Sequence, residues 1–324
     1  MFEKRIGEIS ERLGKEKKVF FIITHKKHRR EIYFQNSERA IDFMKSRFNS
    51  IGKRVVYLLI KWGILQPFLK KIRLSKDLGE IIFVAGQIKA FDLKTKKVFS
   101  FIKGKEEKED FIRSKEEQKR ISRLGFAPLI YNLDKDWPMC EEELLEQYKG
   151  GEDIKVFKKI YSFYEKKGIK KVDIGEFSKY LMKEAAKKEI RDKLIYSVLG
   201  KISLSSKKIL VAEVHGDLSK EQVLEKNGSF VFTDWSLHKG LIIEDLVNFF
   251  LTEEKLTGIP SEKNKNFLKL LGLYPKEVRE NIGIYLIMNE IHFLIRRDKE
   301  LGLYRSRLRR FLSEYHFSMT RATR

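Results

Sequence analysis

The chain has 324 residues, and its 68 Lys and Arg against 46 Asp and Glu leave a formal net charge of +22. Hydrophobic residues at 42% and aromatic residues at 12% can bury a sizeable core, which excludes a disordered basic tail, and the length favours two domains. The single cysteine, Cys140, excludes a disulfide framework and a cysteine-rich metal site, and indicates a reducing compartment. The first residues lack the apolar segment of a secretory signal, and no apolar run approaches the roughly 18 residues of a membrane span. We therefore expect a cytoplasmic protein.

Residues 1–77 are expected to form a basic N-terminal extension. They hold 20 Lys and Arg against 8 Asp and Glu, so a balance of +12 lies in less than a quarter of the chain. Such a charge attracts phosphate groups, whether on nucleic acid, anionic lipid or glycan. Within the extension, the apolar run at residues 20–24 and the pattern at residues 37–48 indicate a strand-like segment and a helix.

The segment 53–73 mixes apolar residues with lysines and arginines, and Pro67 should end or kink any helix within it. One interpretation is a basic amphipathic surface for a membrane or an acidic partner, with Trp62 at the interface. The other is an ordinary helix that packs on the next lobe and keeps its lysines in water. The sequence leaves both interpretations open.

Residues 78–149 have the pattern of a small lobe with short strands and one helix, which ends near Gly125. After the break at Gly150 and Gly151 the pattern is mostly helical, so residues 150–324 are expected to form a second lobe. The expected strands are 81–85, 87–93, 97–103, 129–133 and 142–147, and the expected helices are 106–124, 153–166, 174–201 and several from residue 244 onward.

One stretch of the helical half is strand-like. Residues 209–214 run into His215-Gly216-Asp217, and Asn227-Gly228 separates two alternating apolar runs. This pair predicts a type I′ hairpin, because both residues tolerate positive φ. The expected register places Gln222 at the same end of the hairpin as Asp234, and Asp217 on the preceding loop can reach that end too.

Two carboxylates and an amide oxygen at one end of a hairpin suit a hard cation such as Mg²⁺. A carboxylate that is not fully committed to the metal can accept the proton of an attacking hydroxyl. The competing interpretation makes Asp217 a turn residue and Asp234 a cap at the strand end. The convergence of both with Gln222, after a strand-rich lobe, favours a functional site.

The run His215-Gly216-Asp217-Leu218, followed by Gln222 and by Asp234-Trp235, resembles the phosphotransfer signature of the aminoglycoside phosphotransferase and choline kinase families. The resemblance extends over residues 78–324 and includes relatives that phosphorylate lipopolysaccharide or other glycans. It implies an α+β, two-lobed, protein-kinase-like fold. The N-lobe would be a small antiparallel sheet with one helix, and the C-lobe would be mainly helical.

The resemblance also implies roles for these residues. Asp217 would be the catalytic base or would orient the acceptor hydroxyl, and His215 would brace the loop. Asp234 would bind Mg²⁺ together with Gln222, which stands where the family usually has asparagine. A glutamine offers the same carbonyl oxygen on a longer arm.

For the nucleotide, the resemblance implies a lysine at the end of the third strand, paired with a glutamate on the following helix. Lys103 and Glu117 are the candidates, with Glu117 chosen because it lies one heptad before Leu124, which is taken as inward-facing. The adenine would meet the backbone near Glu146, Gln147 and Tyr148. No glycine-rich GxGxxG loop is present to cover the phosphates.

The predicted function is therefore transfer of the γ-phosphate of ATP, with Mg²⁺, to a hydroxyl group. A chain at +22 repels cationic acceptors, so a sugar of a lipopolysaccharide or a related anionic glycan is the leading acceptor among small molecules and glycans. Glu244 and Asp245 are expected to line the acceptor pocket, or in the case of Asp245 to serve a structural role. Residues 1–77 would contact an anionic membrane surface, on the inner face of the membrane.

Two other classes of function stay open. One is a catalytically weak kinase-like scaffold, suggested by Gln222 and by the missing glycine-rich loop. The other is a nucleic-acid-binding protein, suggested by the charge and by residues 26–30, although no recognisable reading module is present. A zinc site is not expected, because the six histidines show no ligand spacing.

Overall fold

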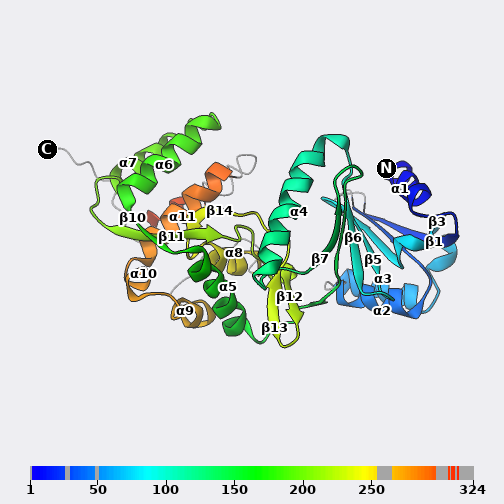
Figure 1. Cartoon of the computed structure of the whole chain (residues 1–324). Coiled ribbons are helices and arrows are strands. Elements are labelled where there is room, and N and C mark those ends of the chain that lie inside the picture. Colours follow the sequence, from blue (N-terminus) through cyan, green and yellow to red (C-terminus); the bar gives the residue numbers. More distant parts are fainter. Residues whose placement is uncertain are drawn as a thin grey trace. The chain divides into compact units, whose positions relative to one another are not determined.

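The computed structural model describes residues 2–25, 30–47, 51–253, 265–296, 306, 308–310 and 312–313. The chain divides into two compact units (Figure 1). The first unit comprises Met1–Gln147 with Leu224–Thr233, and the second comprises Tyr148–Val223 with Asp234–Arg324. Within the described residues, no helix has the length and apolar composition needed to cross a bilayer.

The first unit is built on an antiparallel sheet. Among the described residues the sheet has eight strands in the order β3-β1-β2-β4-β5-β6-β8-β7. The strands are β1 (Lys17–His25), β2 (Arg30–Phe34), β3 (Lys70–Ser75), β4 (Ile81–Val84), β5 (Ile88–Asp92), β6 (Lys97–Phe101), β7 (Ile130–Asp134) and β8 (Met139–Glu143). The strands predicted at 81–85, 87–93, 97–103 and 129–133 are confirmed, with boundaries that differ by a few residues.

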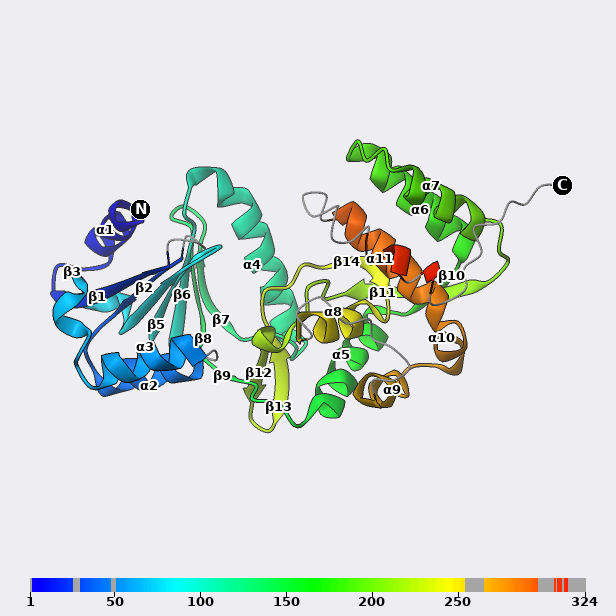
Figure 2. The same cartoon turned by 180° about the vertical axis from the view of Figure 1, so that it is seen from behind.

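Helices cover both faces of this sheet (Figure 2). Helix α1 (Glu3–Leu13) packs on one face with Phe20, whereas α2 (Glu38–Arg47) and α3 (Ile51–Lys61) pack on the other face with Phe21. Consecutive strand residues point to opposite faces, so both phenylalanines are buried. This explains why residues 19–23 of β1 are continuously apolar instead of alternating.

Strands β1, β2 and β3 correct one prediction. Residues 1–77 do not form an extension ahead of a small sheet, because their three strands belong to the same sheet and β2 pairs with β4. An unpaired β4 would leave a row of backbone donors and acceptors exposed at the sheet edge. The helix predicted at 106–124 is α4 (Lys108–Arg123) and the one predicted at 37–48 is α2, and the first unit also contains α1 and α3.

The second unit is mainly helical, as predicted. Its described helices are α5 (Asp153–Lys167), α6 (Ile174–Lys187), α7 (Lys193–Ile202), α8 (Glu244–Glu253), α9 (Lys265–Leu271), α10 (Lys276–Glu280) and α11 (Ile282–Arg296). A small antiparallel sheet of β10 (Lys170–Asp173), β11 (Lys208–Val214) and β14 (His238–Leu241) lies among them. The chain as a whole is therefore of the predicted α+β class.

The single helix predicted over residues 174–201 is wrong. Helix α6 ends at Lys187, and Glu189 adopts a positive φ of 56° that no helix continues through. Helix α7 then begins after Asp192, whose carboxylate accepts a hydrogen bond from the Leu194 N–H as an N-cap. Periodicity alone missed this break because both helices keep an apolar face.

The predicted hairpin is confirmed. Strands β12 (Val223–Lys226) and β13 (Ser229–Phe232) are neighbours in a sheet of order β13-β12-β9, where β9 is Glu146–Gln147. Asn227 and Gly228 both have positive φ, at 50° and 74°, as a type I′ turn requires. Gln222 directly precedes β12, and Asp234 follows β13 by two residues.

Candidate active site

The loop that carries Asp217 follows strand β11 directly. Gly216 in this loop has a φ of 86°, and a Cβ atom there would lie 2.6 Å from the carbonyl oxygen of Ser236. Only glycine meets both conditions without a shift of the backbone. The glycine of the His-Gly-Asp run is therefore required by the path of the loop.

Asp245 anchors this loop from the protein interior. Its buried carboxylate accepts the backbone N–H groups of His215 and Gly216, each at 2.8 Å, and the hydroxyl of Tyr164 at 2.6 Å. Burial raises the pKa of Asp245 above its ordinary value, although nearby His215 and the hydrogen bond from Tyr164 act in the opposite direction. Asp245 was expected either to line the acceptor pocket or to serve a structural role, and these contacts are those of a structural residue.

His215 connects the loop to the segment that carries Asp234. Its buried ring lies 4.5 Å from the Trp235 ring, centroid to centroid, and its carbonyl accepts the Ser236 N–H at 3.0 Å. The Asp217 N–H donates to the His215 Nδ1 atom at 3.4 Å. Two segments about twenty residues apart in sequence, each with one of the predicted carboxylates, are thus held side by side.

The three predicted oxygen donors differ in their surroundings. Asp217 is half-buried, and Asp234 is exposed with a positive φ of 55°, a conformation that aspartate tolerates better than most residues. The Gln222 Oε1 atom accepts the Ser219 N–H at 2.6 Å in a capping box. An amide oxygen has two lone pairs, so this bond leaves Gln222 able to bind a cation as well.

The resemblance implies a strand lysine paired with a glutamate on helix α4, but the buried pair seen here has its lysine on α4 and its glutamate on a strand. Lys115 Nζ lies 3.3 Å from each carboxylate oxygen of Glu142 on β8, and 3.0 Å from Gln118 Oε1. Glu142 also accepts the Gln118 side-chain N–H at 2.6 Å and the Ser100 hydroxyl at 2.9 Å. All four side chains are buried. The buried Lys–Glu pair seen in the first unit is therefore Lys115–Glu142.

The pKa of Glu142 is set by two opposing influences. Burial by itself raises it, but the charges of Lys115 and Lys89 and the hydrogen bonds from Gln118 and Ser100 bring it below its ordinary value. The carboxylate is therefore ionised in the folded protein at neutral pH, and Lys115 supplies the larger part of its countercharge.

Lys103 and Glu117 were predicted to pair with each other at the nucleotide site, and the structure places them as follows. Lys103 lies beyond the end of β6, with its ammonium 5.1 Å from the Phe2 ring centroid and its backbone N–H bonded to Glu107 at 3.2 Å. Glu117 is half-buried on α4. The reason for choosing Glu117 is wrong, because Leu124 follows the end of α4 and is 41% exposed.

The segment predicted to meet the adenine is largely bonded to the hairpin. Glu146 and Gln147 form β9, which pairs with Glu225 and Leu224 of β12. The Tyr148 N–H donates to the Val223 carbonyl at 3.0 Å, and the Tyr148 hydroxyl donates to Asp153 at 2.7 Å. The backbone amide of Tyr148 is thus already committed within the protein.

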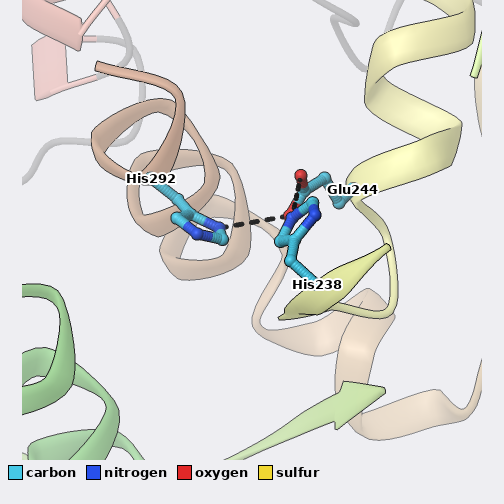
Figure 3. A group of neighbouring side chains, drawn as sticks. All are labelled: His238, Glu244 and His292. Atoms are coloured by element: carbon cyan, nitrogen blue, oxygen red, sulfur yellow. Dashed lines mark hydrogen bonds and ion pairs between the residues drawn. The ribbon is translucent and has the colours of Figure 1, made fainter. Parts of the chain in front are cut away.

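A cluster that the sequence did not predict lies around Glu244, whose carboxylate is buried at the start of α8 (Figure 3). It contacts His238 Nε2 at 2.7 Å and His292 Nδ1 at 3.2 Å. Burial by itself would raise the pKa of Glu244, but the two imidazoles hold it well below its ordinary range. The possible ligand atoms of these three residues all lie within 4.8 Å of one another, a spacing compatible with a metal ion.

A guanidinium group already supplies positive charge to this cluster. Arg296 Nη1 lies 2.8 Å from Glu244 Oε1 and 2.9 Å from His238 Nε2, so a divalent ion would have to displace it. The same nitrogen donates to the Gly216 carbonyl at 3.1 Å. The cluster therefore links α11 to the loop of Asp217, and we interpret it as a brace of that loop and not as a metal site.

No signal in the sequence could have joined these residues. Arg296 is 80 positions from Gly216 and 58 from His238. The spacing of the histidines along the chain gave no indication of a shared cluster, and it is the fold that brings His238 and His292 onto one glutamate.

Replacing Arg296 with alanine is expected to lower the rate of the phosphoryl transfer that the resemblance implies by roughly 10- to 100-fold, because the backbone next to Asp217 loses its link to α11. The ATP binding that the resemblance implies should change little. Hydrogen exchange should become faster in the segment 214–218 and stay unchanged in α5. Arg279→Ala, at an exposed arginine of the same unit, is the control.

Added guanidinium ion should restore part of the activity of Arg296→Ala. If amide hydrogen exchange at 214–218 is the same in this variant as in the wild type, the loop does not depend on this arginine.

Comparisons with known proteins give matches among solved structures. No family model and no curated protein matches this chain. The solved structures include choline kinase LicA from Streptococcus pneumoniae, 15% identical, covering 70% of this chain and 88% of that chain with a TM-score of 0.45. A choline kinase from Cryptosporidium parvum is 14% identical and covers 73% of this chain and 86% of that chain, with a TM-score of 0.46. LicA in complex with AMP is 14% identical and covers 97% of each chain, with a TM-score of 0.44.

These solved structures are small-molecule kinases. With identities of at most 15% and TM-scores below 0.5, the likenesses assign no residue and no substrate to this chain.

Proposed function

We propose that this protein is a phosphotransferase that moves the γ-phosphate of ATP to a hydroxyl group, with Mg²⁺ as its metal. The observation that supports this most strongly is the Asp217 loop. Its backbone is bonded to buried Asp245, while the Asp217 side chain lies half-buried next to the segment of Asp234. A carboxylate on a rigid backbone beside a second carboxylate is what in-line phosphoryl transfer needs.

The residues of the second unit fit a magnesium ion. Asp234 and Gln222 would hold it, because both offer oxygen ligands and the exposed Asp234 leaves room for water and phosphate oxygens. When bound, the ion would neutralise charge on the β- and γ-phosphates. For the nucleotide, the proposal keeps Lys103, supported by Glu117, as the phosphate contact, and the chain near Glu146 and Tyr148 as the adenine contact.

Asp217 would act on the acceptor. Its carboxylate would orient the hydroxyl for in-line attack and accept its proton as the bond to phosphorus forms. Asp245 holds the backbone that leads into that carboxylate, and His215 accepts the N–H of Asp217 itself, so little reorganisation is needed when the acceptor binds.

The acceptor is proposed to be anionic or attached to a membrane. The net charge of +22 disfavours cationic acceptors, whereas a sugar hydroxyl on a lipopolysaccharide or a related glycan carries phosphate or carboxylate neighbours. Association with an anionic membrane surface belongs to the same proposal.

The first test is a thermal melt with ATP and Mg²⁺, followed by a screen of acceptors with labelled ATP. We expect a higher melting temperature with both ATP and Mg²⁺ than with either alone, because a ligand that binds only the folded state stabilises it. Asp234→Asn should abolish the part of the increase in melting temperature that depends on Mg²⁺. Glu225→Gln, at an exposed carboxylate of the hairpin, is the control.

Absence of any ATP-dependent shift, together with failure of every hydroxyl acceptor, would favour the catalytically weak scaffold. Salt-sensitive binding to single-stranded or double-stranded nucleic acid, with no effect of ATP, would favour the interpretation as a nucleic-acid-binding protein. Residues 26–29 of the basic run that suggested it lie outside the described residues.

A further inference from the structure

Helix α3 has two apolar faces. Tyr57 and Ile60 are buried against the sheet, with Val56 packed beside them. On the outer side, Val55, Leu58 and Trp62 are all exposed. A helix that merely docks on a sheet carries polar residues on its outer face, so the outer face of α3 is not explained by packing within the first unit.

The apolar surface continues past the end of the helix. Trp62, just beyond Lys61, is 66% exposed; Ile64 is 52% exposed and Phe68 is 83% exposed. Val55, Leu58 and Trp62 follow one another at spacings of three and four, so they lie along one side. We call these five residues the α3 surface: Val55, Leu58, Trp62, Ile64 and Phe68.

Basic residues lie on the same elements as the α3 surface and on the neighbouring edge strand. Residues 51–75 contain six Lys and Arg and no Asp or Glu. Arg54 and Lys61 are exposed on α3, and Lys71 and Arg73 are exposed on the edge strand β3. Lys71 lies over the Phe21 ring, 5.4 Å from its centroid, which places it on the face of the sheet where α3 packs.

We propose that the α3 surface inserts into the headgroup region of an anionic lipid bilayer. Exposed tryptophan and phenylalanine side chains together with exposed lysines and arginines have the composition of an interfacial membrane anchor. Residues 51–75 contain no acidic residue, so this segment would not repel a bilayer surface on which all the net charge is negative. A protein partner would require acidic groups facing these cations together with a pocket for Phe68. This inference favours the first of the two interpretations of segment 53–73. It rests on the membrane association included in the proposed function, and vesicle binding tests it separately from phosphoryl transfer.

The test measures binding of the full chain to vesicles by co-sedimentation. We expect binding to phosphatidylcholine vesicles that contain about 30 mol % phosphatidylglycerol, and at least about tenfold weaker binding to phosphatidylcholine alone or at high salt. Tryptophan emission should shift to shorter wavelength on binding. The shift should come from Trp62 and be absent in a Trp62→Ser variant, because Trp235 is already buried and Trp137 is half-buried beside Phe101 and Arg12.

Two sets of substitutions separate the apolar and basic contributions. Trp62→Ser with Phe68→Ser should weaken binding by about 30-fold, and Lys61→Glu with Lys71→Glu should do so by a similar factor. The matched controls lie in the second unit: Leu204→Ser, at a leucine that is 80% exposed, and Lys179→Glu with Lys183→Glu, on exposed lysines of α6. Circular dichroism and thermal melts should be unchanged in every variant, because all these side chains are exposed.

Vesicle binding that both sets of variants retain would overturn the proposal. Equal binding to vesicles with and without the anionic lipid would overturn its charge component, and hence the proposal as stated. Self-association of the wild type that Trp62→Ser with Phe68→Ser abolishes, with no binding to vesicles, would assign the surface to a second copy of the chain instead.

Discussion

Asp217→Asn is expected to lower phosphoryl transfer by up to about 10⁴-fold while leaving the binding of ATP and Mg²⁺ nearly unchanged. Asparagine has the same shape, so the loop should keep its backbone bonds to Asp245. It cannot accept the proton of the acceptor hydroxyl, and that is the step which the proposed reaction assigns to Asp217. The measurement is turnover with the acceptor found by the screen, or slow release of phosphate to water, beside a binding titration with a non-hydrolysable ATP analogue.

Glu213→Gln is the matched control for this experiment. Glu213 lies on β11, the strand that leads into the same loop, and forms a surface ion pair with Lys167 at 2.7 Å. The same change of a carboxylate to an amide there should leave turnover within a factor of about two, because exposed ion pairs contribute little. Phosphoryl transfer by Asp217→Asn at the rate of the wild type would refute the proposed role of Asp217.

Lys115→Met is expected to lower the free energy of unfolding by about 3 to 5 kcal/mol. The substitution removes the main countercharge of the buried Glu142 carboxylate, although the bonds from Gln118 and Ser100 and the charge of Lys89 remain. The double substitution Lys115→Met with Glu142→Gln should recover most of the loss, since no buried charge is then left unpaired. Urea unfolding of the wild type and of both variants at pH 7 measures the difference.

The pH dependence of these variants provides an independent check. In the wild type the folded-state pKa of Glu142 lies below the ordinary value of 4.5, so the stability it contributes is present above that pH and is lost as pH falls through the folded-state pKa. In Lys115→Met the unpaired carboxylate should have a raised pKa, so protonation would relieve the penalty. The loss of stability should therefore shrink between pH 7 and pH 5. A loss that stays constant over this range would contradict the assignment to an unpaired carboxylate.

The part of the candidate site that the sequence predicted rests on local signals. The Asn227-Gly228 turn and the run from β11 into His215-Gly216-Asp217 each depend on residues that are close in the chain, so their patterns could be recognised directly. The heptad argument used to choose Glu117 is wrong for a related reason. Heptad spacing to Leu124 assumes that the helix continues with one inward face, and α4 ends at Arg123.

The sequence by itself determined which residues form most of the strands and helices, where the hairpin turns, and which two carboxylates flank it. Only the tertiary structure decided that residues 1–77 share the sheet of the first unit, that α4 presents Lys115 to Glu142, and that Arg296 reaches the Asp217 loop. The physical reason is the range of the interactions. Periodicity and turn chemistry act within a few residues, whereas the partner of a strand edge or of a buried charge is selected by packing between segments 27 to 80 positions apart.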